Sequence, residues 1–209
     1  MTEFETFLTD FARIDEVGIV VMTVPKAAHS AILLALAETF AVPGETYKNA
    51  IKRWRSHKSL AVPPDYLSVG FCRDPLDRFR SCWQDKIATV DSVRAELASI
   101  GCKPGMSLDA FSVLVSEIGD HHLDRHLIPQ YHKFFLDNVL RVNKLFHYEA
   151  LAFEWEIFRE MVLVYCGRRL ADLSRINVSA LVSYQWSEHS RELVRERYAV
   201  DVWATVKRD

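Results

Sequence analysis

An apolar strand pattern followed at once by an apolar helix pattern constrains the fold of this chain more than any other feature. The stretch VGIVVMTVPKAAHSAILLALAET has a continuous apolar run over 17–24, a short polar break, and a helix-forming run from about Ser30 to Phe40. The same plan recurs in YLSVGFCRDPLDRFRSCWQDKI, where a strand over 66–72 leads into a charged helix. Strands that alternate with helices are typical of parallel sheets covered by helices. We therefore predict a three-layer α/β sandwich with a mainly parallel sheet, forming one domain over residues 1–209.

Weaker patterns predict the remaining elements. Amphipathic spacing indicates helices, turn residues indicate loops, and an alternating apolar run indicates one more strand. The expected elements are a helix near 3–12, a basic helix and loop over 47–65, mostly helical structure over 90–120, an irregular segment over 121–135, a strand from 139 that ends near 148–149, a helix over 153–167, a loop over 174–187 and one or two closing helices over 188–206.

The composition excludes several classes of protein. A formal net charge of -2 argues against general binding to nucleic acid or to an anionic membrane, because both need a basic surface. The four cysteines are scattered and form no CxxC pair, so we expect reduced thiols and no disulfide framework. The longest apolar run, Ala31 to Ala37, is far too short to span a bilayer, and no secretory signal is visible. We expect a cytoplasmic protein that is not an integral membrane protein.

The first polar break, TVPKAAHS over 23–30, has the composition of an anion-binding loop. A helix that begins directly after a buried strand leaves its first N–H groups and its positive dipole end facing the connecting loop. Lys26 adds a mobile cation, small residues leave the backbone accessible, and Ser30 adds a hydroxyl. The loop is P-loop-like but contains no glycine, so it is not a Walker A motif. The alternative is a lysine on an ordinary exposed turn.

The second break, RDPLDRFRS over 73–81, offers another anion site. Arg73 follows the strand directly, and Ser81 lies on the helix that Pro75 begins, so a guanidinium and a hydroxyl can close on one phosphate. Arg78 lies five residues after Arg73 and need not share its face, which leaves a structural ion-pair role open. The whole segment is also compatible with a simple charged amphipathic helix.

Together the two loops predict a ligand with two separated anionic ends, and here the chain resembles a known family. VPKAAHS looks like the 5′-phosphosulfate loop, and CRDPLDRFRS like the 3′-phosphate motif R-x-P-x-x-R-x-x-S, of the Golgi-type carbohydrate sulfotransferases (sulfotransferase family 2) and their bacterial relatives. Those enzymes use 3′-phosphoadenosine-5′-phosphosulfate (PAPS) as sulfuryl donor. The resemblance implies donor-binding roles for Pro25, Lys26, Ala27, Ala28, His29, Ser30, Arg73, Arg78 and Ser81.

Weaker similarity extends the resemblance to roughly residues 20–205. It lies in four segments: DRHLIPQ is similar to the family's D-x-H-x-x-P-Q, LFHYEAL to a strand that ends in a tyrosine or arginine followed by Glu, RINVS to H-x-N-x-S, and the closing helix to a Y-x-x-D element. The matching positions are Asp124, His126, Pro129, Gln130, Asn177, Ser179, Tyr198 and Asp201, of which Asn177 and Ser179 are implied to bind the donor. Two positions depart from the family pattern, because His29 replaces a small residue and Arg175 replaces a histidine.

The resemblance implies a PAPS-dependent sulfotransferase that acts on a hydroxyl of a saccharide or glycoconjugate and needs no metal. Lys26 would stabilise the bridging oxygen as charge develops there. A histidine is suited to take the acceptor proton because it titrates near neutrality. His57, between the two loops, is the first candidate for this base, and His126 in the D-x-H segment is the second.

Several alternatives stay open at this stage. The chain could be a non-catalytic nucleotide- or carbohydrate-binding protein of the same fold, or a P-loop kinase, although no Walker motif and no carboxylate after a strand for Mg²⁺ is evident. HHLDRH invites a metal site, which its spacing disfavours. The basic stretch KNAIKRWRSHK is either a solvated helix face or a groove for the acceptor. A homodimer is a further open alternative.

Overall fold

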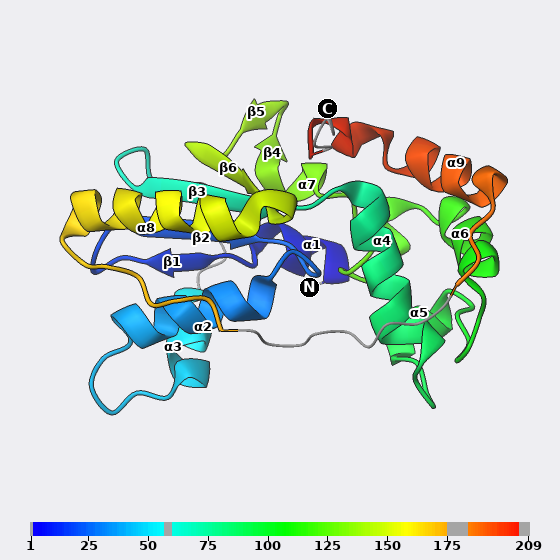
Figure 1. Cartoon of the computed structure of the whole chain (residues 1–209), viewed down its shortest axis with the longest axis horizontal. Coiled ribbons are helices and arrows are strands. Elements are labelled where there is room, and N and C mark those ends of the chain that lie inside the picture. Colours follow the sequence, from blue (N-terminus) through cyan, green and yellow to red (C-terminus); the bar gives the residue numbers. More distant parts are fainter. Residues whose placement is uncertain (1, 57–59, 175–183, 205–209) are drawn as a thin grey trace.

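The computed structural model describes residues 2–56, 60–174 and 184–204 (Figure 1). Its central sheet has the strand order β1-β2-β3-β6. The parallel strands β2 (Ile19–Thr23), β3 (Leu67–Cys72) and β6 (Lys144–His147) are joined at one edge by the antiparallel strand β1 (Ala12–Ile14). This arrangement confirms the predicted α/β fold with a mainly parallel sheet.

Helices and short turns surround the sheet, and a separate two-stranded hairpin lies beside it. The hairpin consists of β4 (Phe135–Leu136) and β5 (Val139–Leu140). The helical elements are α1 (Glu3–Thr9), α2 (His29–Phe40), α3 (Tyr47–Trp54), α4 (Pro75–Trp83), the π-helix η1 (Gln84–Ala88), α5 (Ala95–Ser99), α6 (Leu108–Ser116), η2 (Asp120–His122), α7 (Tyr131–Phe134), η3 (Tyr148–Ala150), α8 (Leu151–Cys166), α9 (Glu188–Arg197) and η4 (Ala199–Ala204).

The alternation of side chains along β2 divides the apolar interior into two cores. Val20 and Met22 pack into one core with buried residues of α1, α4, α6 and α9. Ile19 and Val21 point the other way, into a core shared with α2, α3 and α8. Burying both faces of β2 explains why this strand is apolar from Ile19 to Met22 rather than at every second position.

Two predicted elements differ from the structure. The first helix ends at Thr9 instead of residue 12, because the ammonium of the buried Lys133 donates to the carbonyls of Phe7 and Asp10, and the chain then turns into β1. The strand predicted from residue 139 to Tyr148–Glu149 is divided into β5 and β6. Asp137 and Asn138 both have positive φ angles, 51° and 62°, and form the two-residue turn between β4 and β5.

The connections after the parallel strands position the functional site. α2 begins six residues after Thr23, and α4 begins three residues after Cys72. Asp74 caps α4 by accepting a hydrogen bond from the N–H of Asp77 at 3.0 Å, and Pro75 occupies the first helical position. Because β2, β3 and β6 are parallel, these loops meet at the carboxyl edge of one sheet, which is where ligands bind in open α/β folds.

Candidate functional site

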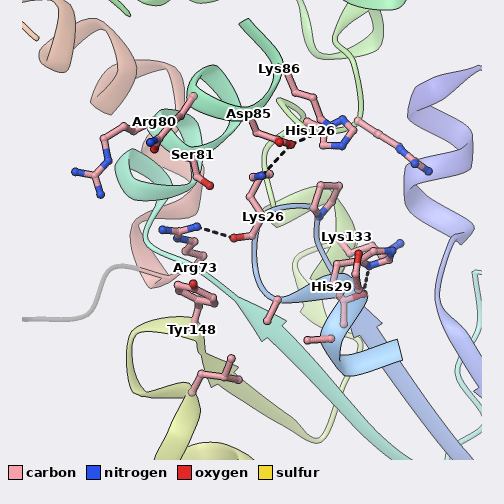
Figure 2. Close-up of a pocket in the computed structure, with 18 of the residues that line it drawn as sticks. Lys26, His29, Arg73, Arg80, Ser81, Asp85, Lys86, His126, Lys133 and Tyr148 are labelled. Atoms are coloured by element: carbon pink, nitrogen blue, oxygen red, sulfur yellow. Dashed lines mark hydrogen bonds and ion pairs between the residues drawn. The ribbon is translucent and has the colours of Figure 1, made fainter. Parts of the chain in front are cut away.

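A cavity of about 750 Å³ lies where the loop after β2, the segment from Arg73 to Lys86 and the start of η3 meet. Figure 2 shows Lys26 between a group formed by Arg73, Ser81 and Tyr148 and a group formed by Asp85, Lys86 and His126. The residues predicted from sequence that line the cavity are Pro25, Lys26, Ala28, His29, Ser30, Arg73, Ser81 and His126. The structure therefore brings both predicted anion loops to one shared space.

The backbone of the loop after β2 is shaped for an anion. Lys26 and Ala28 adopt left-handed conformations, with φ angles of 72° and 55°, whereas the φ of Ala27 between them is not positive. Alternation of this kind turns successive N–H groups toward one side, although the N–H of Ala27 already donates to the carbonyl of Val24 at 3.2 Å. Within the described chain, no side chain caps the first turn of α2, and His29 and Ser30 of this turn line the cavity. Ala27 itself is fully buried and supports the loop from below.

Two arginines of the second motif fix this loop by binding its carbonyl groups. Arg73 donates from Nη1 to the carbonyl of Lys26 at 2.8 Å, and Arg78 donates from Nε to the carbonyl of Pro25 at 3.2 Å. Arg78 is only 1% exposed and does not line the cavity. Its position favours the structural role left open by the sequence. Both carbonyls are thereby paired with guanidinium groups.

Arg73 is itself held on three sides. Its backbone N–H donates to Gln130 Oε1 at 2.9 Å, and Gln130 Nε2 donates back to its carbonyl at 2.7 Å. Its guanidinium lies over the ring of Tyr148, 4.3 Å from the centroid. Burial lowers the pKa of Arg73, partly offset by Tyr148 and nearby carboxylates, yet an arginine remains a cation at neutral pH. Arg73 Nε is buried and has no hydrogen-bond partner in the described part of the chain.

The closing segment supports Gln130 through a buried carboxylate. Asp201 accepts hydrogen bonds from the backbone N–H groups of Gln130, at 2.8 Å, and Tyr131, at 2.7 Å. Tyr198 donates its hydroxyl proton to the carbonyl of Leu127 at 2.6 Å. The two segments quoted above as D-x-H-x-x-P-Q and Y-x-x-D are therefore joined to each other and, through Gln130, to Arg73.

His126 and Asp124 form a buried dyad at the cavity. His126 Nδ1 lies 2.5 Å from Asp124 Oδ1, and the N–H of His126 donates to the same oxygen at 2.8 Å. Burial lowers the pKa of His126, and the Asp124 carboxylate opposes that effect. Hydrogen bonds from His126 outweigh burial and lower the pKa of Asp124, so the carboxylate is ionised and can only accept. Nδ1 therefore carries the proton of the neutral ring, and Nε2 is left as the basic nitrogen.

His29, which departs from the family pattern in the first loop, lines the cavity as a neutral side chain. Its Nδ1 lies 2.5 Å from the hydroxyl of Thr23, and burial followed by repulsion from Lys133 lowers its pKa to about 3. Lys133 lines the cavity beside it, and burial lowers the pKa of this lysine well below its usual value. His29 therefore offers the ligand a hydrogen-bonding ring without a positive charge.

Several cavity residues were not singled out by the sequence: Arg80, Gln84, Asp85, Lys86, Arg125 and Lys133. Arg80 was detectable, since it precedes Ser81 inside the second motif. Asp85 and Lys86 carried no signal, because α4 continues as a π-helix that no residue pattern announces. His57, the first candidate base, and Asn177 and Ser179 lie outside the described residues.

The predicted histidine cluster shows no metal-binding arrangement. Over residues 2–56, 60–174 and 184–204, no group of three or more His, Cys, Asp or Glu side chains is placed to hold a metal ion. His126 is occupied by Asp124, and His132 Nε2 lies 2.6 Å from Asp120 Oδ2.

Among the same residues, no helix has both the length and the apolar surface required to cross a bilayer.

A comparison with family models decides the relationship. The model described as "Sulfotransferase family" matches residues 9–201 of the 209-residue chain. The chain belongs to the sulfotransferase family. This match confirms the family resemblance inferred from the two loops, and it spans every segment that carried it. Membership of the sulfotransferase family supports a transferase that moves a sulfuryl group to an acceptor. No curated protein and no solved structure gives a significant match.

Proposed function

We propose that the chain is a PAPS-dependent sulfotransferase that modifies a hydroxyl of a saccharide or glycoconjugate. One observation carries the proposal: Lys26, Arg73 and Ser81 line the same cavity, from loops that follow two neighbouring parallel strands. PAPS bears anionic groups at its 5′ and 3′ ends, and the cavity offers cationic side chains on two of its sides. Its volume, about 750 Å³, is within the range of roughly 300–1,000 Å³ that is usual for ligand sites.

In this proposal the first loop binds the 5′-phosphosulfate as P-loops bind phosphate. The N–H groups at the start of α2 and the Lys26 ammonium supply the positive charge. Arg73 and Ser81 bind the 3′-phosphate, and Arg80, on the same cavity wall, adds a second guanidinium. Arg78 keeps the loop in shape from behind and makes no contact with the donor.

The chemical step assigned to these residues is one in-line displacement. The S–O bond to the donor phosphate breaks while an S–O bond to the acceptor hydroxyl forms, and the acceptor proton passes to His126 Nε2. Lys26 stabilises the negative charge that develops on the departing phosphate oxygen. Asp124 keeps the His126 ring in the required tautomer and stabilises the imidazolium that forms. Of the two predicted bases, we assign this role to His126, because it lines the cavity and has a carboxylate partner.

Two experiments test the proposal in order. The first is a calorimetric titration with 3′,5′-adenosine bisphosphate and, separately, with ATP and Mg²⁺. Binding of the bisphosphate alone is expected, and preferential binding of ATP with Mg²⁺ would favour a kinase instead. The second incubates the protein with radiolabelled PAPS and a panel of saccharides, and label in a saccharide is expected. Bisphosphate binding without any transfer to the panel would favour a non-catalytic binding protein.

A further inference from the structure

We propose that Asp85 is a positioning residue that holds Lys26 in the donor-free protein and gives it up to the donor, while Lys86 keeps the Asp85 carboxylate paired. The inference rests on the proposed function, because it concerns how Lys26 reaches an anionic ligand. It adds that Lys26 changes its ionic partner within the cavity, from Asp85 to the donor. Asp85 and Lys86 lie outside both predicted loops.

The two lysines share a single oxygen atom. Lys26 Nζ lies 3.0 Å from Asp85 Oδ2, and Lys86 Nζ lies 2.9 Å from the same Oδ2. All three side chains line the cavity, and Figure 2 shows Asp85 beside the tip of Lys26. Lys26 is the least exposed of the three, with 14% of its side chain accessible, against 38% for Asp85 and 28% for Lys86. The Lys26 ammonium is therefore largely withdrawn from solvent and occupied by a protein carboxylate.

The π-helix explains how this cluster is built. In an α-helix, three consecutive side chains span about 200° around the axis, and in η1 Gln84, Asp85 and Lys86 all contribute to the cavity wall. π-helical turns are rare and often occur at functional sites. Asp85 and Lys86 lie in this π-turn, which continues the helix that begins in the second motif. The turn places the Asp85 carboxylate and the Lys86 ammonium beside the loop after β2.

Asp85 and the anionic donor compete for the Lys26 ammonium. Burial disfavours its ionised form, but hydrogen bonds from Lys86 and Lys26 outweigh this and lower the pKa of Asp85, so it is an anion at neutral pH. Lys26 has three N–H donors, and a phosphosulfate that draws its ammonium away from Oδ2 breaks the 3.0 Å contact. Because Lys86 stays on Oδ2, Asp85 is not left as an unpaired, partly buried charge when Lys26 departs. Because both lysines contact the same oxygen, the free energy needed to move Lys26 from Asp85 to the donor is small.

Replacing Asp85 with asparagine tests this exchange. With Asp85→Asn, Lys26 has no ion pair to break, and the Kd for 3′,5′-adenosine bisphosphate in calorimetry is expected to fall ~3- to 10-fold. Asp85→Ser serves as a second variant with the same expectation, and Glu192→Gln, which removes an equal charge from exposed helix α9, is the control that leaves the Kd unchanged.

A double-mutant cycle separates an action through Lys26 from a general effect of charge. In the Lys26→Met background, Asp85→Asn is expected to change the Kd less than ~2-fold, because its partner is gone. An equal gain in both backgrounds, or no gain in the native one, would overturn the inference and leave the donor assignment standing. A native protein that binds no bisphosphate would refute the proposed function and this inference together.

Discussion

Gln130 connects the fold to the proposed donor site, and replacing it has consequences that follow from its contacts. The side chain is fully buried and makes two hydrogen bonds, at 2.9 and 2.7 Å, to the backbone of Arg73. Gln130→Leu keeps the approximate volume and removes both. Each Arg73 group that is left unpaired costs about 1–3 kcal/mol, or about 2–6 kcal/mol for the two, and the lower end is expected because the bonds are only part-buried. The peptide N–H and C=O of Arg73 then lose the side chain that holds this residue and orients its guanidinium.

The assay combines urea denaturation with calorimetry. Gln130→Leu is expected to lower the free energy of unfolding by about 2 kcal/mol and to weaken the binding of 3′,5′-adenosine bisphosphate by ~10-fold or more, equivalent to ~1.4 kcal/mol. Gln185→Leu, at an exposed position, is the matched control and should stay within ~0.5 kcal/mol of the native protein. A Gln130→Leu protein with native stability and native affinity would refute the reasoning.

Three further predictions concern the cavity. Lys26→Ala is expected to lower kcat/KM for the donor by ~10²–10³-fold while the circular dichroism spectrum stays native; an unchanged kcat/KM would remove Lys26 from the reaction. His126→Asn is expected to reduce turnover by ~10²–10⁴-fold with bisphosphate affinity unchanged, and equal turnover would return attention to His57. His29, with a pKa of about 3, stays neutral in the folded state while the unfolded chain binds a proton below about pH 6.5. The native protein should therefore lose up to ~1.4 kcal/mol more stability per pH unit than His29→Gln between pH 6.5 and 4.5, measured by urea denaturation at each pH.

The two strand–loop–helix units were predictable because each consists of a long apolar run, a polar break and a helix start. Parallel strands place their carboxyl ends at one edge, so the meeting of Lys26 with Arg73 and Ser81 also followed from the sequence. These are consequences of local pattern and of one topological rule. The roles proposed for these residues are what the binding experiments decide.

Other features depend on tertiary contacts that no local pattern records. The three-residue strand β1 is too short for a period, and its pairing with β2 decides its conformation. The turn at Asp137 and Asn138 had favourable residues, and the apolar run around it concealed that signal. The positions of Asp85 and Lys86 depend on a π-turn, and the burial of Arg78 depends on the Pro25 carbonyl that it meets across the cavity wall.

The central claim is that one doubly phosphorylated nucleoside is held by Lys26 at one end and by Arg73 with Ser81 at the other. Calorimetric titration of 3′,5′-adenosine bisphosphate into the native protein, Lys26→Ala and Arg73→Ala tests it most directly. We expect saturable binding to the native protein that needs no Mg²⁺ and is weakened at least ~10-fold in each variant. Equal affinity in all three proteins, or no binding to any of them, would contradict it.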